Sequence, residues 1–384
     1  MIKDIATPYY LIHEDKLRRN LELISAVAHR SGAKIIMAFK ANAAWKTFGI
    51  IAEYCQASTA SSLNEMRLSL DYLGHDVHAY CPVYTDATIR QFVEGCSHLV
   101  FNSVAQYEKY LGLVDEYNAT HPTSDRVSCG LRVNPECSVI ETDIYNPCKP
   151  GSRFGVTRDV LGNRLPDGLE GLHFHCLCES TSYDLEKVLA AFEERFGEFL
   201  PRLKWVNMGG GHLMTREGYD TEHLIALLSG FRRRHPNLEV ILEPGSAFTW
   251  RTGELVTTVL DVVENQGVKT AIIDASFACH MPDCLEMPYK PAIEEALHEP
   301  VDGKPTYRIG GNSCLSGDFI GDWSFDQELK PGDRLTFEDM NHYTTVKTNM
   351  FNGISHPSMV LLRHDGKVEM LREFGYEDYR DRMD

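Results

Sequence analysis

Hydrophobic positions in the first two thirds of the chain alternate between the spacing of a helix and that of a buried strand. Leu17, Leu21, Ile24 and Ala28 recur at helical spacing, which places them on one face of a helix. The apolar run Ile35–Phe39 follows and predicts a buried β-strand. The pattern therefore predicts a helix followed by a strand, beginning near residue 15.

Further segments of strand character continue this alternation to about residue 242. Helical stretches separate most of them, for example the apolar stripe of Leu185, Val188, Leu189, Phe192 and Phe196. The later predicted strands are Gln56–Ala60, His78–Cys81, Leu99–Phe101, Val127–Val133, Leu169–Phe174, Trp205–Met208 and Glu239–Leu242. Eight strands alternating with helices fit a closed (β/α)8 barrel. An open doubly wound sheet is the alternative, but the GxGxxG motif expected after its first strand is missing.

The pattern changes after about residue 250, where strand signals follow one another without long helices. Predicted strands are Val256–Val263, Arg334–Glu338, Met359–Arg363 and Lys367–Leu371. The last two flank Asp365-Gly366, a dipeptide typical of β-hairpin turns. The first ten or so residues, which include Thr7–Leu11, are expected to join this second part.

A chain of 384 residues is too long for one ordinary core and fits a barrel with a second domain. We therefore expect an α/β protein, with the barrel over residues 15–250 and a β domain formed by residues 1–14 and 251–384. No apolar run reaches the roughly 20 residues of a membrane span, and Met1–Ile5 has no apolar export signal. These features predict a cytoplasmic protein without a membrane partner.

The charge and the cysteines narrow the function classes. A net charge of −17 argues against nucleic acid as a partner and favours cationic ligands, although an acidic surface also serves solubility. The eleven cysteines are expected to be reduced thiols, because the chain shows no secretory signal. Two loose pairs, Cys137 with Cys148 and Cys279 with Cys284, lack the spacing of metal knuckles.

Candidate chemistry lies at the carboxyl ends of the predicted strands, where βα barrels place their functional side chains. A lysine at such an end offers a nucleophilic amine to a carbonyl cofactor, although many strands simply end in a solvated lysine. The residues at these ends are Lys40, Ser61, Arg132, His175, Gly209, Gly210, Gly211 and the segment Glu243–Ser246.

These strand ends hold the parts of a pyridoxal 5'-phosphate site. Lys40 would bind the cofactor covalently, and the glycine triplet would close its backbone N–H groups around the phosphate. Glu243 would pair with the pyridine nitrogen, and His175 would stack on the ring. A carboxylate that keeps this nitrogen protonated strengthens the electron sink that decarboxylation requires.

Each part also has a purely structural interpretation. The glycine triplet and Glu243–Gly245 can be tight turns, and Arg132 can be a solvated strand end. Alternate residues of His173–Glu179 share a face, as in a metal site, but the sequence does not complete the ligand set of a catalytic zinc. Because the features occur together at successive strand ends, they favour a cofactor site, and no metal is expected.

Longer motifs make the chain similar to a known family. In the first part they are Ala38–Asn42, Tyr145–Gly155, His173–Glu179, Met208–Gly211 and Glu243–Gly245, and in the second part Met281–Tyr289, Ser313–Asp318 and His342–Thr344. On these motifs the chain resembles, nearly end to end, the fold-type III pyridoxal phosphate decarboxylases. Within that family it resembles the carboxynorspermidine/carboxyspermidine decarboxylase branch. The resemblance implies an alanine racemase-like fold, in which a barrel carries a C-terminal β domain.

The resemblance also implies roles for residues to which the strand-end argument assigns none. Cys314 would be the catalytic residue that returns a proton after carbon dioxide leaves. Arg132, Gly245 and Tyr343 would contact the cofactor. Cys314, Asp318 and Tyr343 would reach into the site of a neighbouring subunit, so the resemblance implies a homodimer with shared active sites.

The implied substrate is an amino acid with a polyamine tail, decarboxylated to norspermidine or spermidine. Carboxylates are needed to bind the ammonium groups of such a tail, and the candidates are Asp283, Glu286 and Asp318. Surface solvation is the alternative for Glu286. The sequence does not distinguish carboxynorspermidine from carboxyspermidine.

Two positions depart from the pattern of neighbouring branches. Leu315 follows Cys314 where ornithine decarboxylases carry an aspartate and diaminopimelate decarboxylases a glutamate. Ser246 follows Glu-Pro-Gly where both carry an arginine, so one phosphate or substrate contact must be supplied differently. Both departures count against a diaminopimelate or ornithine decarboxylase. The β domain and Cys314 count against the other alternative, a non-catalytic pyridoxal phosphate carrier.

Overall fold

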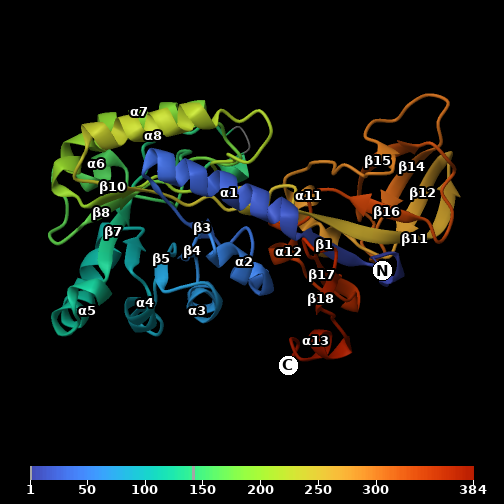
Figure 1. Cartoon of the computed structure of the whole chain (residues 1–384), viewed down its shortest axis with the longest axis horizontal. Helices are drawn as coiled ribbons and strands as arrows, with labels where there is room; N and C mark the ends of the chain where they lie inside the picture. Colours follow the sequence, from blue (N-terminus) through green and yellow to red (C-terminus); the bar gives the residue numbers. More distant parts are fainter. Residues whose placement is uncertain (1, 141–142) are drawn as a thin grey trace. The chain divides into compact units, whose positions relative to one another are not determined.

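The computed structural model describes residues 2–140 and 143–384, which form two compact units (Figure 1). One unit, here called the barrel unit, comprises Asn20–Phe248. The other, here called the sheet unit, comprises Met1–Arg19 and Thr249–Asp384. Helix α1 (Glu14–Ser31) begins in the sheet unit and ends in the barrel unit.

The barrel unit is built on a parallel sheet with the strand order β2-β10-β9-β8-β7-β6-β5-β4-β3. Its strands are β2 (Lys34–Ile35), β3 (Met37–Ala38), β4 (Ala57–Ala60), β5 (Asp76–Tyr80), β6 (His98–Phe101), β7 (Ser128–Arg132), β8 (Gly171–His173), β9 (Trp205–Asn207) and β10 (Glu239–Leu242). Every strand predicted in this part of the chain is present. The first, Ile35–Phe39, is divided in two at Ile36.

The division of the first strand closes the barrel. β2 pairs in parallel with β10, whereas β3 pairs in parallel with β4. The backbone N–H of Ile36 donates to Leu242 O at 2.9 Å, and that of Phe39 donates to Thr59 O at 3.3 Å. One segment therefore bonds to both neighbours and leaves no open edge there, which confirms the predicted barrel over the doubly wound alternative.

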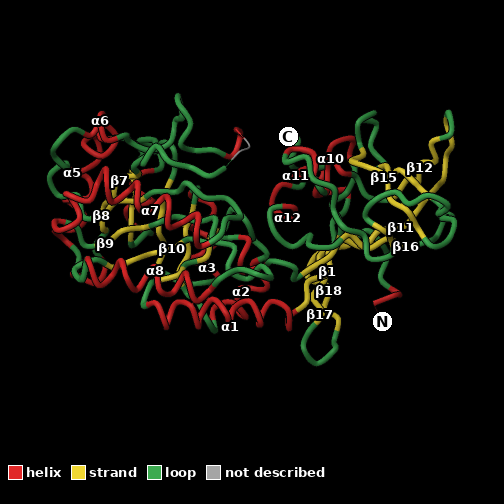
Figure 2. The backbone as a smooth tube through the Cα atoms, turned by 90° about the horizontal axis from the view of Figure 1, so that it is seen from above, coloured by secondary structure: helices red, strands yellow, loops and turns green. Residues whose placement is uncertain are grey.

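Helices lie outside these strands (Figures 1 and 2). After α1 they are α2 (Phe48–Ala52), α3 (Leu63–Tyr72), α4 (Ile89–Gly95), α5 (Val104–Thr120), α6 (Arg158–Leu161), α7 (Ser182–Phe196), α8 (Thr221–Arg234) and α9 (Ser246–Thr249). The predicted stripe of α7 is buried throughout, and α7 begins with a capping box between Thr181 and Asp184. In α1 the predicted Leu17, Leu21 and Ile24 are buried as well.

Trp205 fills the amino-terminal end of the barrel. Its indole lies against Gly130 and Gly171, and its Nε1 donates to Ser128 Oγ at 2.8 Å. A Cβ atom on Gly171 would stand 2.0 Å from the indole Cε2, and one on Gly130 would stand 2.1 Å from Cη2. Because these two glycines on neighbouring strands have no side chains, they leave room for the large Trp205 indole.

The sheet unit is a mixed sheet with the order β13-β15-β14-β12-β11-β1-β17-β18, and β16 also pairs with β11. Its strands are β1 (Tyr9–His13), β11 (Gly253–Asn265), β12 (Val268–Ile273), β13 (Ala296–Leu297), β14 (Thr306–Gly310), β15 (Phe319–Phe325), β16 (Arg334–Phe337), β17 (Ser358–Leu362) and β18 (Val368–Arg372). Short helices connect them: α10 (Phe277–His280), α11 (Pro282–Glu286), α12 (Thr344–Lys347) and α13 (Tyr376–Arg380).

The amino-terminal segment joins this sheet as predicted. β1 runs antiparallel to β11 and parallel to β17. The hairpin of β17 and β18 is also present, closed by Arg363 N–H to Lys367 O at 2.8 Å, with Gly366 at φ +82°. Strands β12 to β15 were not predicted, because their character depends on pairing and burial in the sheet. In the chain as described, no helix combines the length and apolarity that a membrane crossing needs.

Gly171→Ala should lower the free energy of unfolding by about 1–3 kcal/mol, because the added methyl group overlaps the Trp205 ring. Urea unfolding measures this change. Gly112→Ala is the matched control, since Gly112 lies in α5 with nothing within 4 Å of its Cβ position. Alanine there should raise stability by about 0.5–1 kcal/mol. Equal effects at the two glycines would contradict the packing role of Gly171.

Candidate active site

A cavity of about 620 Å³ opens at the carboxyl ends of the barrel strands. Six of the candidate residues at the predicted strand ends line it: Lys40, Ser61, Arg132, His175, Gly210 and Glu243. They lie at or just beyond the carboxyl ends of different strands, and the closed barrel brings these strand ends together. The predicted Gly209, Gly211 and Gly245 belong to the same turns as lining residues.

Lys40, His175 and Gly210 form a continuous chain of contacts. The backbone N–H of Gly210 donates to His175 Nδ1 at 2.9 Å. The other ring nitrogen, Nε2, lies 3.2 Å from Lys40 Nζ. Because Nδ1 accepts a hydrogen bond, the neutral imidazole carries its proton on Nε2 and presents it to the lysine nitrogen.

The electrostatics of the cavity favour the neutral forms of both groups. Lys40 is open to the cavity but enclosed by protein on its other sides, and this burial, with the nearby Arg132 charge, lowers its pKa. Burial likewise holds the pKa of His175 well below its usual value, assisted by Lys40 and Arg132. A neutral lysine amine is the form that attacks a carbonyl carbon.

Asn207 connects the glycine triplet to Glu243. Its Nδ2 donates to Glu243 Oε1 at 2.6 Å, and its Oδ1 accepts from the N–H of Gly209 at 2.9 Å. Burial raises the pKa of Glu243, while the bond from Asn207 and the Lys40 charge oppose that rise. The carboxylate is therefore fixed in direction at the wall of the cavity.

The glycines at this end are required by close packing. A Cβ on Gly209, Gly210 or Gly211 would stand 2.5 Å from Phe174 O, 2.5 Å from Glu243 O or 2.3 Å from Leu177 O, respectively. A Cβ on Gly245 would stand 2.6 Å from Ala41 Cβ, beside Lys40. Two N–H groups of the triplet, those of Gly209 and Gly210, already have acceptors within the protein.

Arg132 is held between two aromatic rings. Its guanidinium carbon lies 4.7 Å from the centre of the Tyr80 ring and 4.5 Å from that of Phe154. Its Nη2 donates to His175 O at 3.1 Å. The side chain is buried, so the alternative of a solvated strand end is wrong.

Sequence reasoning assigned no cofactor role to several residues at this cavity. Asn207, which bonds to the lining residue Glu243, and His173, considered above only within a motif, give no periodic signal, because they lie on strands whose other residues are apolar. The segment 144–154 supplies much of one wall, although we quoted it above only as part of a family motif. The lining residues not predicted include Ala38, Thr59, Tyr80, Pro82, Ile144, Tyr145, Asn146, Pro147, Lys149, Gly151, Ser152, Arg153, Phe154 and His173.

The other predicted site residues lie in the sheet unit. Cys314 is exposed, and its N–H donates to Asn352 Oδ1 at 2.8 Å. Asp318 is buried and accepts bonds from Ser313 Oγ at 2.6 Å and from Ala278 N–H at 2.9 Å. The Asp318 carboxylate therefore supports the loop that carries Cys314. Its predicted contact with the substrate stays a prediction.

Asp283, Glu286 and Tyr343 also belong to this unit. The carboxylates of Asp283 and Glu286 converge on Lys347 Nζ, which lies 2.5 Å from Asp283 Oδ1. The chain thus already holds one alkylammonium group between the two predicted carboxylates. Tyr343 has φ of 32°, a backbone conformation that costs energy for a residue with a side chain.

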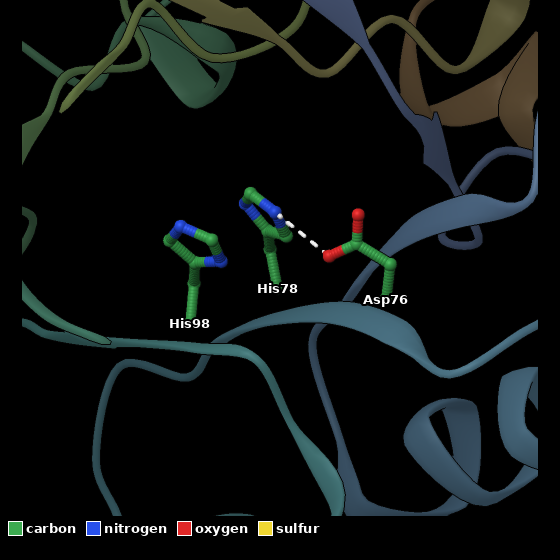
Figure 3. A group of neighbouring side chains, drawn as sticks. All are labelled: Asp76, His78 and His98. Atoms are coloured by element: carbon green, nitrogen blue, oxygen red, sulfur yellow. Dashed lines mark ion pairs between the residues drawn. The ribbon is translucent and has the colours of Figure 1, made fainter. Parts of the chain in front are cut away.

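A second polar group lies at the amino-terminal end of the barrel, where Figure 3 shows Asp76 beside the rings of His78 and His98. The rings stack with centroids 3.9 Å apart and planes 19° apart, so their in-plane lone pairs run nearly parallel and do not meet at one ion. Lys34 Nζ lies 2.6 Å from Asp76 Oδ2 and 3.3 Å from His78 Nε2. Lys34 supplies the positive charge that balances Asp76.

Comparison with known proteins agrees with this geometry. Residues 81–341, more than half of the chain, match the family described as "Pyridoxal-dependent decarboxylase, C-terminal sheet domain". The chain belongs to this pyridoxal-dependent decarboxylase family. Its enzymes use pyridoxal phosphate, so the predicted decarboxylase class and cofactor are confirmed.

The chain is similar over its full length to enzymes of one branch. It is 44% identical to the carboxyaminopropylagmatine decarboxylase of Synechocystis sp., covering 100% of this chain and 96% of the relative. It is 40% identical to the carboxynorspermidine/carboxyspermidine decarboxylase of Campylobacter jejuni, covering 98% of both. The crystal structure of carboxynorspermidine decarboxylase from Campylobacter jejuni complexed with norspermidine superposes with a TM-score of 0.89 at 39% identity, covering 98% of this chain and 100% of that one.

The cavity fits pyridoxal phosphate on its own observations. A lysine amine with a lowered pKa opens into it, and a buried carboxylate with a fixed direction forms part of its wall. Within the part of the chain that the structure describes, both ring nitrogens of His173 are buried without a hydrogen-bond partner. His173 also lines the cavity, so a polar group bound there would meet it.

Lys40→Met should stabilise the cofactor-free protein at pH 7. The folded-state pKa of Lys40 lies below its unfolded value of about 10.5, so protonation costs the folded protein more than the unfolded chain. The gain from methionine should be complete below the folded pKa and vanish as the pH rises through 10.5. Urea unfolding over a pH series measures this, with the exposed Lys46→Met as the control. A gain independent of pH would contradict it.

Proposed function

We propose that this chain is a decarboxylase of amino acids that carry a polyamine tail, with carboxynorspermidine or carboxyspermidine as substrate and norspermidine or spermidine as product. The full-length similarity to enzymes of that branch carries the proposal. A carboxylated aminopropyl derivative of agmatine is the second candidate substrate, favoured by the 44% identity to the Synechocystis sp. relative. The two candidates differ at the far end, an ammonium in one and a guanidinium in the other.

Pyridoxal phosphate, when bound, supplies the electron sink into which the electrons of the broken carbon–carboxylate bond pass. Lys40 would hold the cofactor through its amine, which contacts His175 and whose pKa is lowered by burial in the cavity. Glu243 would bind the ring nitrogen, with its direction set by Asn207. Arg132 would add a fixed positive charge, held in place by its aromatic neighbours.

The glycines and Tyr343 complete the proposed cofactor contacts. Gly209, Gly210, Gly211 and Gly245 would let the backbone approach the phosphate closely, since none leaves room for a side chain. The N–H groups of Gly209 and Gly210 donate to Asn207 and His175, and these two hydrogen bonds fix the conformation of the turn. The fixed turn would then form the phosphate-binding end of the site, although no arginine follows Glu-Pro-Gly.

The cavity charge indicates where the substrate tail does not bind. Among the described lining residues, Lys40, Arg132, Lys149 and Arg153 are basic, whereas Glu243 is the acidic one. These walls suit the cofactor phosphate and the substrate carboxylate, but they repel a polycation. The tail therefore requires carboxylates from elsewhere, and Asp283, Glu286 and Asp318 remain our candidates.

We also propose that Cys314 returns the proton and that it acts in the site of a second copy of the chain. Cys314 is exposed. Three large apolar side chains near it are also exposed: Leu315 and Phe319, which follow Cys314 in the sequence, and Phe351, which precedes its hydrogen-bond partner Asn352. A partner subunit would bury this apolar surface. The proposal includes a homodimer with shared sites in the cytoplasm, where the eleven free cysteines would stay reduced.

Purified holoenzyme should release carbon dioxide from carboxynorspermidine, carboxyspermidine or the carboxylated agmatine derivative, at least about 100-fold faster in kcat/KM than from diaminopimelate or ornithine. A manometric or enzyme-coupled assay measures this release. Preference for diaminopimelate or ornithine would contradict the proposed substrate class. A protein that binds the cofactor but releases no carbon dioxide from any of them would be a carrier.

In the same assay, Asp283→Asn should raise KM for the preferred substrate about tenfold and leave the visible absorbance of the cofactor intact, because it removes a charge partner for an ammonium group. Lys347→Met removes the competing ammonium of the chain itself. The two variants should therefore shift KM in opposite directions. An unchanged KM in Asp283→Asn would show that the tail binds elsewhere.

Mixing two inactive variants tests the shared sites. Lys40→Ala and Cys314→Ala should each lose most activity alone, since each removes a group from every site. Subunit exchange between them should restore about a quarter of the wild-type activity, because one site of each mixed dimer then holds both native residues. Mixed dimers without recovered activity would place Lys40 and Cys314 of each site on the same chain.

A further inference from the structure

The loop that carries Cys314 is tied to a second segment of the sheet unit. This loop, residues 311–318, is here called the cysteine loop. The backbone N–H of Cys314 donates to Asn352 Oδ1 at 2.8 Å, across 38 positions of the sequence. Cys314 is exposed, and so are the three residues that follow it, so side-chain packing does little to hold this part of the loop. Its polar contacts therefore decide where the backbone of Cys314 lies.

The base of the cysteine loop is held by its own carboxylate. Asp318 is buried, and its Oδ2 accepts from Ser313 Oγ at 2.6 Å and from Ser313 N–H at 3.2 Å. Its Oδ1 accepts from the N–H of Ala278, in α10, at 2.9 Å. Gly311 leaves space for this carboxylate, because a Cβ there would stand 2.2 Å from Asp318 Oδ2. These bonds attach the residue before Cys314 to α10.

The segment that contains Asn352 is attached to the same helix. Asn349 Nδ2 donates to Ala278 O at 2.8 Å. Asn349 Oδ1 accepts from the N–H of Phe351, the residue before Asn352, at 3.0 Å. Ala278 therefore anchors both segments, one through its N–H and the other through its carbonyl. The bond between Cys314 and Asn352 closes a ring of hydrogen bonds that has α10 at its base.

The backbone of Asn352 is shaped for this contact. It has φ of 57° and ψ of 13°, within the short helical turn Phe351–Gly353. This left-handed conformation costs energy for most residues, and glycine and asparagine adopt it most readily. Of these two, only asparagine also supplies a side-chain acceptor. Position 352 thus combines the required backbone conformation with the oxygen that binds Cys314.

We propose that Asn352 is a positioning residue for the proton return by Cys314, an inference that rests on the proposed function. In that step the S–H bond of Cys314 breaks, and its proton joins the electron pair on the carbon that lost carbon dioxide. A C–H bond forms there, and the thiolate regains a proton from water. Proton delivery to one face of this carbon requires that the donor be held on that side. Asn352 fixes the backbone of the donor and so limits the positions of its thiol.

Two substitutions separate the hydrogen bond from the backbone conformation. Asn352→Gly permits the left-handed conformation but removes the acceptor, whereas Asn352→Asp keeps an acceptor oxygen. Amide hydrogen exchange of the holoenzyme, followed by mass spectrometry, reports on the Cys314 N–H. This N–H should exchange about five- to tenfold faster in Asn352→Gly than in wild type or Asn352→Asp. Equal exchange in all three proteins would overturn the proposal.

A matched control tests the left-handed conformation alone. Gln266 has φ of 51° and lies in the turn between β11 and β12. Gln266→Gly should leave the exchange of the Cys314 N–H unchanged. Faster exchange at Cys314 in this variant as well would mean that the hydrogen bond to Asn352 is not what protects it, and the proposal would be wrong.

Catalysis provides the second measurement. Asn352→Gly should lower kcat about tenfold and leave KM and the visible absorbance of the cofactor unchanged, because binding does not involve this hydrogen bond. In deuterium oxide, wild type should place one deuteron in a single configuration on the carbon that lost carbon dioxide. Asn352→Gly should give both configurations, and Asn352→Asp should restore the single one. A variant that was merely less stable would keep the stereochemistry of wild type.

Cys314→Ala, in the same assays, separates failure of this inference from failure of the proposed function. If Cys314→Ala loses activity while Asn352→Gly keeps the kcat and stereochemistry of wild type, the positioning role of Asn352 is wrong and the role of Cys314 stands. If both variants behave as wild type, the proposed role of Cys314 is wrong and the inference falls with it. A loss in Asn352→Gly that Asn352→Asp shares would also overturn the positioning role.

Discussion

The backbone hydrogen bonds on both sides of the first strand are the constraint on which the barrel and its cavity depend. Segment 34–39 bonds to β10 through its first half and to β4 through its second half. This double pairing closes the sheet and carries Lys40 to the end where the other strands finish. Glu243 then follows β10 and Ser61 follows β4, so both neighbours of Lys40 are set by strand pairing alone. Closure of the sheet thus completes the barrel and also places the residues that follow its strands around one cavity.

Within the cavity, hydrogen bonds from the glycine turn set the chemistry of the larger side chains. Gly210 fixes the proton of His175, and His175 in turn faces Lys40. Gly209 fixes Asn207, and Asn207 orients Glu243. The turn therefore acts through its backbone on both proposed ends of the cofactor, and its lack of side chains is a packing requirement. A lysine amine with a lowered pKa and a carboxylate held in one direction suit a decarboxylase of this family.

The two ends of the barrel handle charge differently. At the amino end, Asp76 is balanced by Lys34 and its pKa is held well below the usual range, because contacts from His78 and Lys34 outweigh burial. That end is filled by packed side chains, Trp205 among them. The carboxyl end is open and predominantly basic, so under the proposed function the cationic tail of the substrate would need carboxylates outside its walls. The proposed substrate class would thus depend on residues that the barrel does not supply.

The sequence by itself determined the barrel, the hairpin and the candidate residues Lys40, His175 and Glu243. Helical and strand spacing report local burial, and a strand end in a βα barrel has one predictable location. Only the tertiary structure decided the division of the first strand and the role of Asn207. Each depends on partners far apart in the chain, for which no local pattern exists. It also showed that the glycine triplet serves packing and donates to His175 and Asn207, because hydrogen-bond acceptors are assigned in space and not along the sequence.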